Sequence, residues 1–143
     1  MKITPNLMFQ TDAREAFQAY ADILKADRLD LITFADMPDA PVGPDWQDKI
    51  AHAWLQVGDQ AIMGSDSPPG VCADGLETGT AAGDGSVALH FDAPDEARRV
   101  FDALAEGGVV QMPFSPTSWS PGFGMTRDRF GKDWMINTNS PTA

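Results

Sequence analysis

The chain has 143 residues, hydrophobic side chains at 43% of its positions and a formal net charge of −11, which together fit one soluble globular domain. It holds no apolar run near the roughly 20 residues of a membrane-spanning helix, and its N-terminus lacks the features of a secretory signal. The negative charge disfavours nucleic acid and anionic membranes as partners, and the single cysteine, Cys72, cannot form an internal disulfide, so we expect a cytoplasmic protein.

The first half of the chain predicts a strand, a helix and three more strands. The helix runs from Ala13 to about Lys25, because apolar residues recur at helical spacing after Asp12, an expected N-cap whose capping box Glu15 would close. Residues 36–48 hold three prolines and four aspartates, which predicts a loop and leaves open whether it forms a lid. The four strands of this half are predicted at residues 2–9, 28–34, 49–57 and 61–65.

The second half predicts the same order of elements, after a linker rich in Gly, Pro and Asp at residues 69–85. Asp92 is the expected N-cap of its helix, Pro94 fits the first turn, and Gly107 follows the end of the helix near Glu106. The four strands of this half are predicted at residues 86–91, 109–115, 124–127 and 132–137.

The two halves also resemble each other in sequence. The pattern around Glu15 returns at Glu96, and the pattern around Gly58 returns in the same order at Gly131. The two copies of the second pattern lie closer together in the sequence than the two copies of the first. Two copies of one unit, the second with a shorter middle, explain both spacings.

The repeat predicts an α+β fold in which a single domain, residues 1–143, holds two tandem βαβββ modules. We place module one at residues 1–68 and module two at residues 86–143. Such a module leaves one face of its sheet uncovered, so two curved modules side by side are expected to form a trough that takes a ligand.

Several motifs point to one family. In chain order they are ITPNLMF at residues 3–9, then EAFQAY, HAWLQVGDQAIMGSDSPP, EGGVVQMPF at 106–114, Trp119 and FGMTRDRFGKDWMIN at 123–137. In these motifs the chain resembles the PhnB-like family, often labelled demethylubiquinone methyltransferase-like, of the vicinal oxygen chelate superfamily. Glyoxalase I, extradiol dioxygenases and bleomycin-resistance proteins belong to the same superfamily. The resemblance covers nearly the whole chain and implies a glyoxalase-like fold of two βαβββ modules.

The resemblance also implies where a metal would be held, because superfamily enzymes bind a divalent ion with His and Glu from the first and last strands of each module. In module one the first strand offers Asn6 or Met8, and the last strand offers Gly64. In module two the first strand offers His90 or one of its neighbours, and the last strand offers Asn137, the predicted counterpart of Gly64 in the repeat. A catalytic metal needs about three ligands of the His, carboxylate or Cys type, and only His90 qualifies. We therefore expect no metal and no cofactor.

Two histidines are candidate catalytic residues. His52 shares a strand face with Trp54, where the family commonly shows His-Ala-Glu-Leu and this chain has replaced the acid. His52 is either a hydrogen-bonding or general-base group at the trough wall, or a histidine bonded to backbone or to a dimer partner. His90 faces the trough if Leu89 and Phe91 pack under the helix.

The ligand-binding residues that we predict come from strands and one loop. Trp119 sits among Ser, Pro and Gly, so it is expected to cap the trough or a partner's surface, while methionines give an adaptable apolar wall. Arg127 either binds a carboxylate or phosphonate or forms a salt bridge within the turn. The predicted ligand-binding set is Trp54, Met63, Trp119, Met125, Arg127 and Asn137.

The sequence therefore predicts a metal-independent, cytoplasmic protein that binds a small, mostly apolar molecule and acts as a homodimer. One alternative is a lyase, isomerase or glyoxalase-type enzyme that uses His52 or His90 as its base, or a divalent metal not recognised here. Another is a resistance-type protein that sequesters a drug without chemistry. The sequence leaves open the identity of the ligand and whether the dimer exchanges modules.

Overall fold

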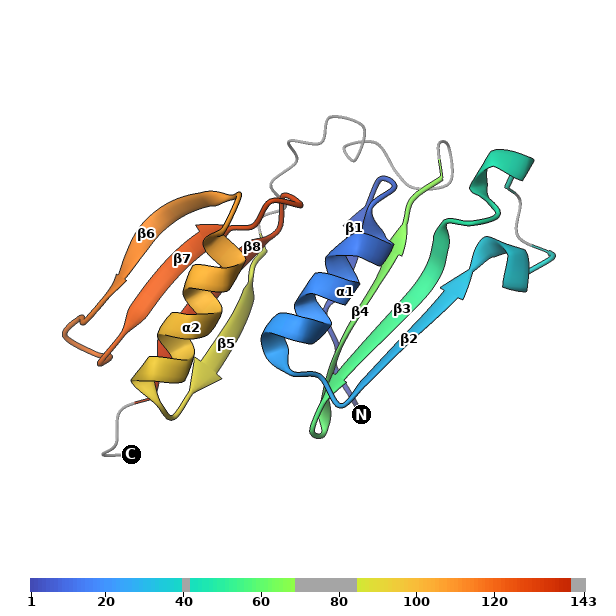
Figure 1. Cartoon of the computed structure of the whole chain (residues 1–143). Coiled ribbons are helices and arrows are strands. Elements are labelled where there is room, and N and C mark those ends of the chain that lie inside the picture. Colours follow the sequence, from blue (N-terminus) through green and yellow to red (C-terminus); the bar gives the residue numbers. More distant parts are fainter. Residues whose placement is uncertain (40–41, 69–84, 140–143) are drawn as a thin grey trace. The chain divides into compact units, whose positions relative to one another are not determined.

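The computed structural model describes residues 1–39, 42–68 and 85–139, and Figure 1 shows its elements. Cys72 and most of the predicted linker lie outside these residues, so the predicted module bounds stay a prediction. Module one consists of β1 (Asn6–Phe9), α1 (Ala13–Leu24), β2 (Arg28–Thr33), two short 3₁₀ helices, η1 (Phe34–Asp36) and η2 (Pro44–Trp46), β3 (Ile50–Val57) and β4 (Gln60–Asp66). Module two consists of β5 (Val87–Phe91), α2 (Pro94–Ala105), β6 (Val109–Ser115), β7 (Phe123–Arg127) and β8 (Asp133–Thr138).

Each module forms its own four-stranded sheet with the same topology. The strand order is β1-β4-β3-β2 in module one and β5-β8-β7-β6 in module two. In each sheet the first strand runs parallel to the last, and the other pairs are antiparallel. The predicted α+β fold of two tandem βαβββ modules is confirmed. Among the described residues, neither helix is long and apolar enough to cross a membrane.

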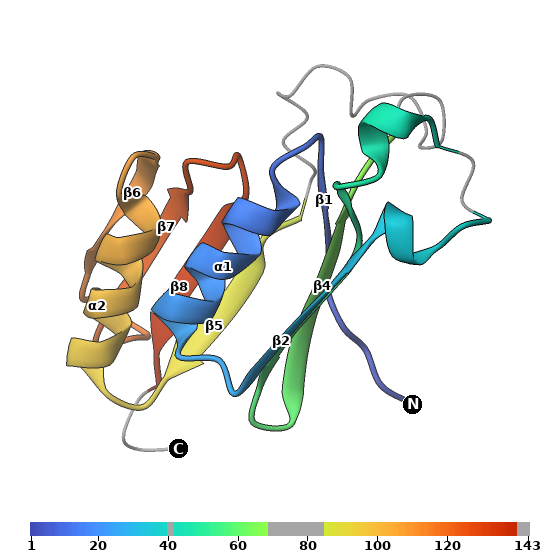
Figure 2. The same ribbon diagram turned by 45° about the vertical axis from the view of Figure 1, so that its right-hand side comes forward.

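The core of module one lies between α1 and one face of its sheet (Figures 1 and 2). Phe17 is fully buried there, and the rings of Phe9 and Tyr20 pack edge-on against it at 5.9 and 5.7 Å between centroids. Gly64 lies beneath this ring, because a Cβ at Gly64 would overlap the Phe17 side chain. The missing side chain lets the helix approach the sheet closely.

The core of module two is built in the same way around α2. Trp134 and Ile136 of β8 are fully buried, and the rings of Phe101 and Phe114 pack at 5.7 Å. Gly124 of β7 makes room for the helix, because a Cβ there would lie 2.7 Å from the Phe101 ring. The apolar residues that recur along both helices therefore face the sheets, as their spacing predicts.

The start of α1 differs from the prediction. Asp12 is the N-cap residue, but its side chain makes no capping hydrogen bond, so the expected capping box with Glu15 is wrong. Asp66 at the end of β4 is only 2% exposed and accepts hydrogen bonds from the backbone N–H groups of Ala13 and Ile50, each at 2.9 Å. One buried carboxylate thus ties the N-terminus of α1 to the last two strands of its sheet.

The start of α2 also uses a different residue. Pro94 occupies the first turn as predicted, but the N-cap residue is Ala93 rather than Asp92. The Asp92 carboxylate instead accepts a hydrogen bond from Asn139 Nδ2 at 3.0 Å. The helix ends before Gly107, whose φ of 75° lies in the left-handed region that glycine adopts without strain.

The strand registers correct the predicted alignment of the two modules. Leu7 pairs with Gly64 in module one, and Leu89 pairs with Ile136 in module two. The counterpart of Gly64 is therefore Ile136 and not Asn137, which corresponds to Ser65 instead. Gly64 faces α1, so it is not the residue that module one presents on its helix-free face.

Candidate functional site

The helix-free face of module one carries the candidate residues of the first half. Trp54 pairs with Met63 across β3 and β4, and Met63 pairs with Asn6 of β1, so all three side chains point away from α1. His52 lies on this face as well, two residues before Trp54 and opposite Ile32. We call this surface the open face of module one; its members include Asn6, Met8, Ile32, His52, Trp54, Gln56, Met63 and Ser65.

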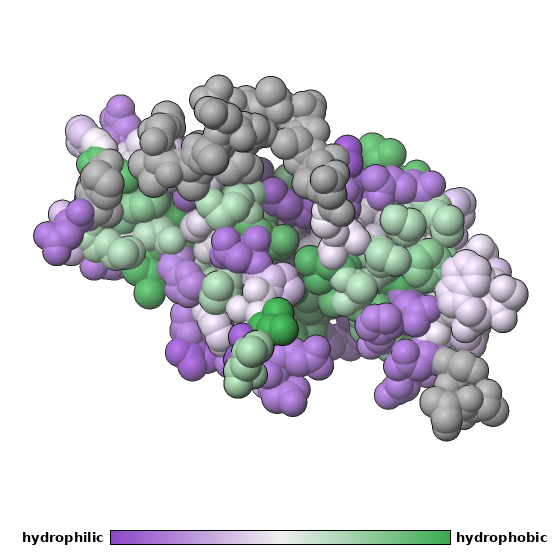
Figure 3. Space-filling model, turned by 180° about the vertical axis from the view of Figure 1, so that it is seen from behind, coloured by the Kyte–Doolittle hydropathy of each residue, from purple (hydrophilic) through white to green (hydrophobic). Residues whose placement is uncertain are grey.

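Polar contacts on this open face involve the indole of Trp54 and the thioether of Met8. The Trp54 indole N–H donates to Gln56 Oε1 at 3.1 Å, and the Lys2 ammonium lies 5.1 Å from the centre of the indole ring. Met8 Sδ accepts weak hydrogen bonds from Asn6 Nδ2 at 3.2 Å and from Ser65 Oγ at 3.5 Å. The surface is therefore a half-exposed mixture of thioether, indole and small polar groups, and the view from behind in Figure 3 shows hydrophobic and hydrophilic residues interspersed.

The helix-free face of module two carries the candidates of the second half. Met125 pairs with Met135 across β7 and β8, and His90 pairs with Asn137 across β5 and β8. Their side chains point away from α2, because the alternate residues of β8, such as Ile136, are buried beneath the helix. This is the open face of module two: Ala88, His90, Phe123, Met125, Arg127, Asp133, Met135 and Asn137.

The two polar side chains His90 and Asn137 form a pair on this face. Asn137 Nδ2 lies 3.1 Å from His90 Nδ1, within hydrogen-bonding distance. The other amide atom, Asn137 Oδ1, is buried and has no hydrogen-bond partner among the described residues. His90 itself is exposed, so the ring nitrogen that Asn137 does not contact is open to a further partner.

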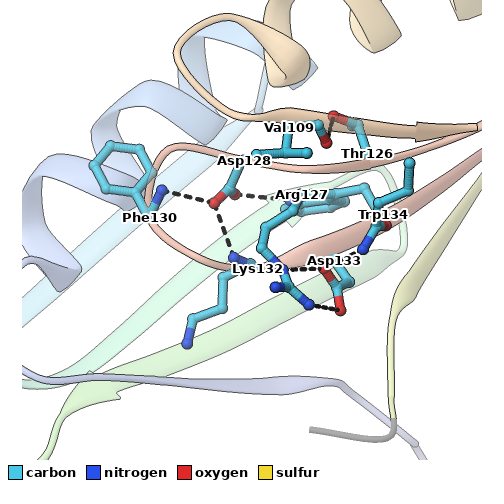
Figure 4. A network of polar contacts seen from close by, with 9 residues as sticks. Val109, Thr126, Arg127, Asp128, Phe130, Lys132, Asp133 and Trp134 are labelled. Carbon is cyan, nitrogen blue, oxygen red and sulfur yellow. Dashed lines mark hydrogen bonds and ion pairs between the residues drawn. The ribbon is translucent and has the colours of Figure 1, made fainter. Parts of the chain in front are cut away.

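Arg127 lies at the end of the same face in a bidentate ion pair. Its Nε and one terminal nitrogen donate to the two carboxylate oxygens of Asp133 at 2.8 and 3.2 Å (Figure 4). This hydrogen bond, with the neighbouring negative charge, raises the pKa of Arg127 above its usual value. The pair joins facing strands of the hairpin, so the guanidinium edge best suited to a ligand carboxylate already binds one.

Asp128 shapes the turn beside this pair. It is 5% exposed, and Oδ1 accepts hydrogen bonds from the backbone N–H groups of Phe130 and Lys132 at 2.9 and 3.0 Å. Its Oδ2 accepts from the indole N–H of the fully buried Trp134 at 2.8 Å (Figure 4). Arg127 thus forms a salt bridge with Asp133 across the hairpin, and the buried Asp128 holds the turn itself.

Trp119 lies on the loop between β6 and β7 and is 64% exposed. Its ring packs edge-on against Phe123 at 5.8 Å between centroids. The loop is held in place because Thr117 Oγ1 accepts from the N–H groups of Trp119 and Ser120, and Ser120 Oγ lies 2.8 Å from the carbonyl oxygen of Thr138. Phe123 in turn pairs with Asn137, so Trp119 stands at the border of the open face of module two.

Comparison with known proteins identifies the family. Residues 1–137 match the model of the family described as 3-demethylubiquinone-9 3-methyltransferase. The chain belongs to this family. Protein YjdN of Escherichia coli strain K12 is 33% identical over 147 residues, which cover 96% of this chain and 95% of that protein.

Solved structures agree with the family and with the fold. Protein PA1353 from Pseudomonas aeruginosa is 43% identical with a TM-score of 0.83, and covers 97% of this chain and 98% of its own. A PhnB protein from Bacillus cereus is 26% identical with a TM-score of 0.73, over 96% of this chain and 99% of its own. A glyoxalase-related enzyme and a fosfomycin resistance protein, at 16% and 8% identity, share the vicinal oxygen chelate fold alone. The predicted PhnB-like family is confirmed, and the likeness to the last two structures agrees with the predicted fold.

The strand places at which the resemblance implies a metal ion carry few metal-binding side chains in this chain. The places on the first and last strands of the modules hold Met8, Ser65, His90 and Asn137 on the open faces. Only His90 has a side chain of the type that a catalytic metal prefers, and a thioether, a hydroxyl and an amide are poor ligands for it. Among the described residues, no group of three or more His, Cys, Asp and Glu side chains is placed to hold a metal ion.

The structure brings together some of the predicted site residues and adds others. Met63 and Trp54 pair on one open face, while Met125, Asn137 and His90 share the other. Sequence reasoning missed Met135 and Phe123, which complete the apolar surface of module two. The alternation of side chains along β8 is a signal that places Met135 and Asn137 on one face. The predicted alignment matched Asn137 with Gly64, so it matched the open face of β8 with the helix-facing side of β4.

Proposed function

We propose that this protein binds a small, mostly apolar molecule on the open faces of its modules, without a metal ion. One observation supports this most strongly: each open face presents large, soft side chains that are only half-buried, Trp54 and Met63 in one module, Met125 and Met135 in the other. Thioether and indole groups adapt to apolar ligands of different shape, and single polar groups beside them give orientation.

Methionine methyl groups are the direct reporters of this binding. We would label the protein with ¹³C at the methionine methyls and titrate it with neutral aromatic compounds. The ubiquinone head group, 2,3-dimethoxy-5-methyl-1,4-benzoquinone, would be included because it carries one methyl group more than the head group of the 3-demethylubiquinone named in the family's description. We expect saturable shifts of Met63 or Met125. Shifts limited to Met37, an exposed residue outside the open faces, would contradict the proposal.

Trp119 supplies the matched test by mutation. Trp119→Ala removes an exposed ring at the border of the open face and should weaken binding about ten-fold, as the loss of one aromatic contact of roughly 1–2 kcal/mol predicts. Met37→Ala removes an apolar side chain of similar exposure elsewhere and should leave the affinity unchanged. Equal affinities of the wild type and Trp119→Ala would show that the loop takes no part.

A second candidate is catalysis with a histidine as general base, which the exposure of His90 on the open face of module two favours. Turnover of a glyoxalase, lyase or isomerase type should then follow the titration of one histidine. His90→Ala should abolish turnover with little change in affinity, and His52→Ala serves as the comparison. If the protein binds the molecule without turnover, and both histidine variants bind it almost as well as the wild type, then the protein sequesters its ligand without chemistry.

We also propose that the protein acts as a cytoplasmic homodimer. The strand β6 supports this, because it exposes Val109, Val110 and Met112 and lies at the edge of its sheet, with no strand on its outer side among the described residues. Sedimentation equilibrium should give twice the mass of the chain, and Val110→Lys should shift the equilibrium toward the monomer. A wild-type monomer at micromolar concentration would contradict the proposal.

A further inference from the structure

His90 and Asn137 are neighbours by strand register, on the parallel pair β5 and β8. Their side chains meet at 3.1 Å between Asn137 Nδ2 and His90 Nδ1 on the open face of module two. The contact joins residues 47 positions apart, so it depends on the sheet and not on local chain geometry. It is also the polar contact that lies beside the apolar pair Met125 and Met135.

The contact determines where the imidazole proton lies. An amide NH₂ group can only donate, so His90 Nδ1 must accept, and the proton of the neutral ring must then sit on Nε2. Rotating the Asn137 amide would reverse these roles and place the NH₂ group at the buried position where Oδ1 now has no donor among the described residues, so the group would need an acceptor there. A buried N–H group without an acceptor is rarer in proteins than an under-used carbonyl oxygen, which favours the orientation seen.

We propose that Asn137 holds His90 in the Nε2–H tautomer, so that this exposed N–H donates a hydrogen bond to a carbonyl or carboxylate oxygen of the bound molecule. The inference rests on the proposed function, since it supplies the polar anchor for an otherwise apolar ligand. Asn137 acts as a positioning residue, and His90 contacts the ligand. The apolar part of the ligand then lies against Met125, Met135 and Phe123, which adjoin the pair through the β7–β8 register.

A neutral Nε2–H group suits binding better than proton abstraction. With its Nδ1 lone pair bonded to Asn137, the ring has no free lone pair to act as a base toward the ligand. Arg127, a cationic donor of this face, is already paired with Asp133. His90 is therefore the donor that a ligand oxygen would meet on the open face of module two.

The tautomer is measured without any ligand. Long-range ¹H–¹⁵N spectra of ¹⁵N-labelled protein at pH 8 distinguish a protonated ring nitrogen from an unprotonated one. We expect His90 with a bare Nδ1, and we expect Asn137→Asp to move the proton to Nδ1, because a carboxylate can only accept. His52, the second histidine, should not change and serves as the internal control. A protonated Nδ1 in the neutral wild-type ring, or an unchanged tautomer in Asn137→Asp, would overturn the inference.

The ligand is tested with three probes of similar size: acetophenone, benzoate and ethylbenzene. We expect the ketone, the carboxylate or both to shift His90 Nε2, whereas ethylbenzene should shift only methionine methyls. His90→Phe should weaken the oxygen-bearing probe about two- to ten-fold, the range for one neutral hydrogen bond, and leave ethylbenzene unaffected. Equal methionine shifts from all probes with an unmoved Nε2 would overturn the anchor and keep the proposed function. Silence of every methionine on both open faces would overturn both.

Discussion

Asp66 and Asp128 are two buried aspartates that bind backbone N–H groups in different modules. Asp66 binds Ala13 and Ile50, and Asp128 binds Phe130 and Lys132 together with the indole of Trp134. In both cases the negative charge is spread over several donors inside the fold, which offsets the cost of removing a carboxylate from water. Although both are ionisable groups near the sheets, their hydrogen bonds assign them to structure and not to the candidate site.

Asp128→Ala tests this role. The change removes the carboxylate that accepts from three donors, one of them on the fully buried Trp134, and should lower the free energy of unfolding by about 3 kcal/mol. Urea unfolding followed by far-ultraviolet circular dichroism measures the change. Asp22→Ala on the exposed side of α1 is the matched control and should leave the unfolding midpoint almost unchanged. Equal midpoints for the two variants would show that the Asp128 contacts contribute nothing net.

At the scale of elements, each module uses one glycine to seat its helix, but on different strands. Ala53 pairs with Gly64 across β3 and β4, and Gly124 pairs with Ile136 across β7 and β8. The glycine lies on the last strand of one module and on the third strand of the other. The repeat therefore preserves the place of the small residue beneath the helix and not its position in the sequence.

Gly64→Ala measures how closely α1 approaches its sheet. The added methyl group would overlap the Phe17 ring and lie 2.8 Å from the backbone oxygen of Leu7, so one of them must move. We expect a loss of about 1–3 kcal/mol in unfolding free energy, the usual cost of overpacking a core. Gly43→Ala has nothing within 4 Å and serves as the control. If the two variants unfold at the same denaturant concentration, the helix is not seated as closely as the structure indicates.

The order and type of the elements could be predicted from the sequence because periodicity and turn residues are local signals. The alignment of the modules could not, because it was anchored on Gly58 and Gly131. The first hairpin closes between Val57 and Gln60, whereas the second closes between Arg127 and Asp133 around a longer turn. With the longer second turn, an alignment anchored on the two glycines places β8 one residue out of step with β4. An error of one residue moves every side chain to the opposite face.

The contacts that complete the site depend on the whole fold and leave no local signature. Asp66 reaches Ala13 across 53 positions, and Asn137 reaches His90 across 47. The sequence predicts Asp12 as the cap of the helix and Asn137 as a ligand-binding residue, but it indicates neither of these two contacts. Only the pairing of the first strand with the last, parallel and non-local, brings these side chains together.

At the scale of the whole molecule, two features make opposite predictions about whether divalent cations bind to the protein. One is the strongly acidic charge, and the other is the absence of a suitable ligand set among the described residues. A net charge of −11 attracts cations of any kind, so metal salts should stabilise the fold slightly by screening repulsion between carboxylates. The open faces, with Met8 and Ser65 in one module and His90 and Asn137 in the other, offer no set of ligands for one ion. Stabilisation by screening depends on ionic strength alone, whereas a bound ion saturates its site.

Thermal unfolding in Ni²⁺, Zn²⁺ and Mn²⁺ separates these effects when each titration is matched by sodium chloride of equal ionic strength. We expect the metal and sodium curves to coincide, and elemental analysis of the purified protein to find metal far below one ion per chain. A resident ion would instead give a saturable rise in unfolding free energy, about 2.7 kcal/mol at one hundred times its dissociation constant. It would be lost in His90→Ala if His90 were a ligand. Such a rise would contradict a metal-independent function, because the ion would then need donors that the register of β1, β4, β5 and β8 does not place together.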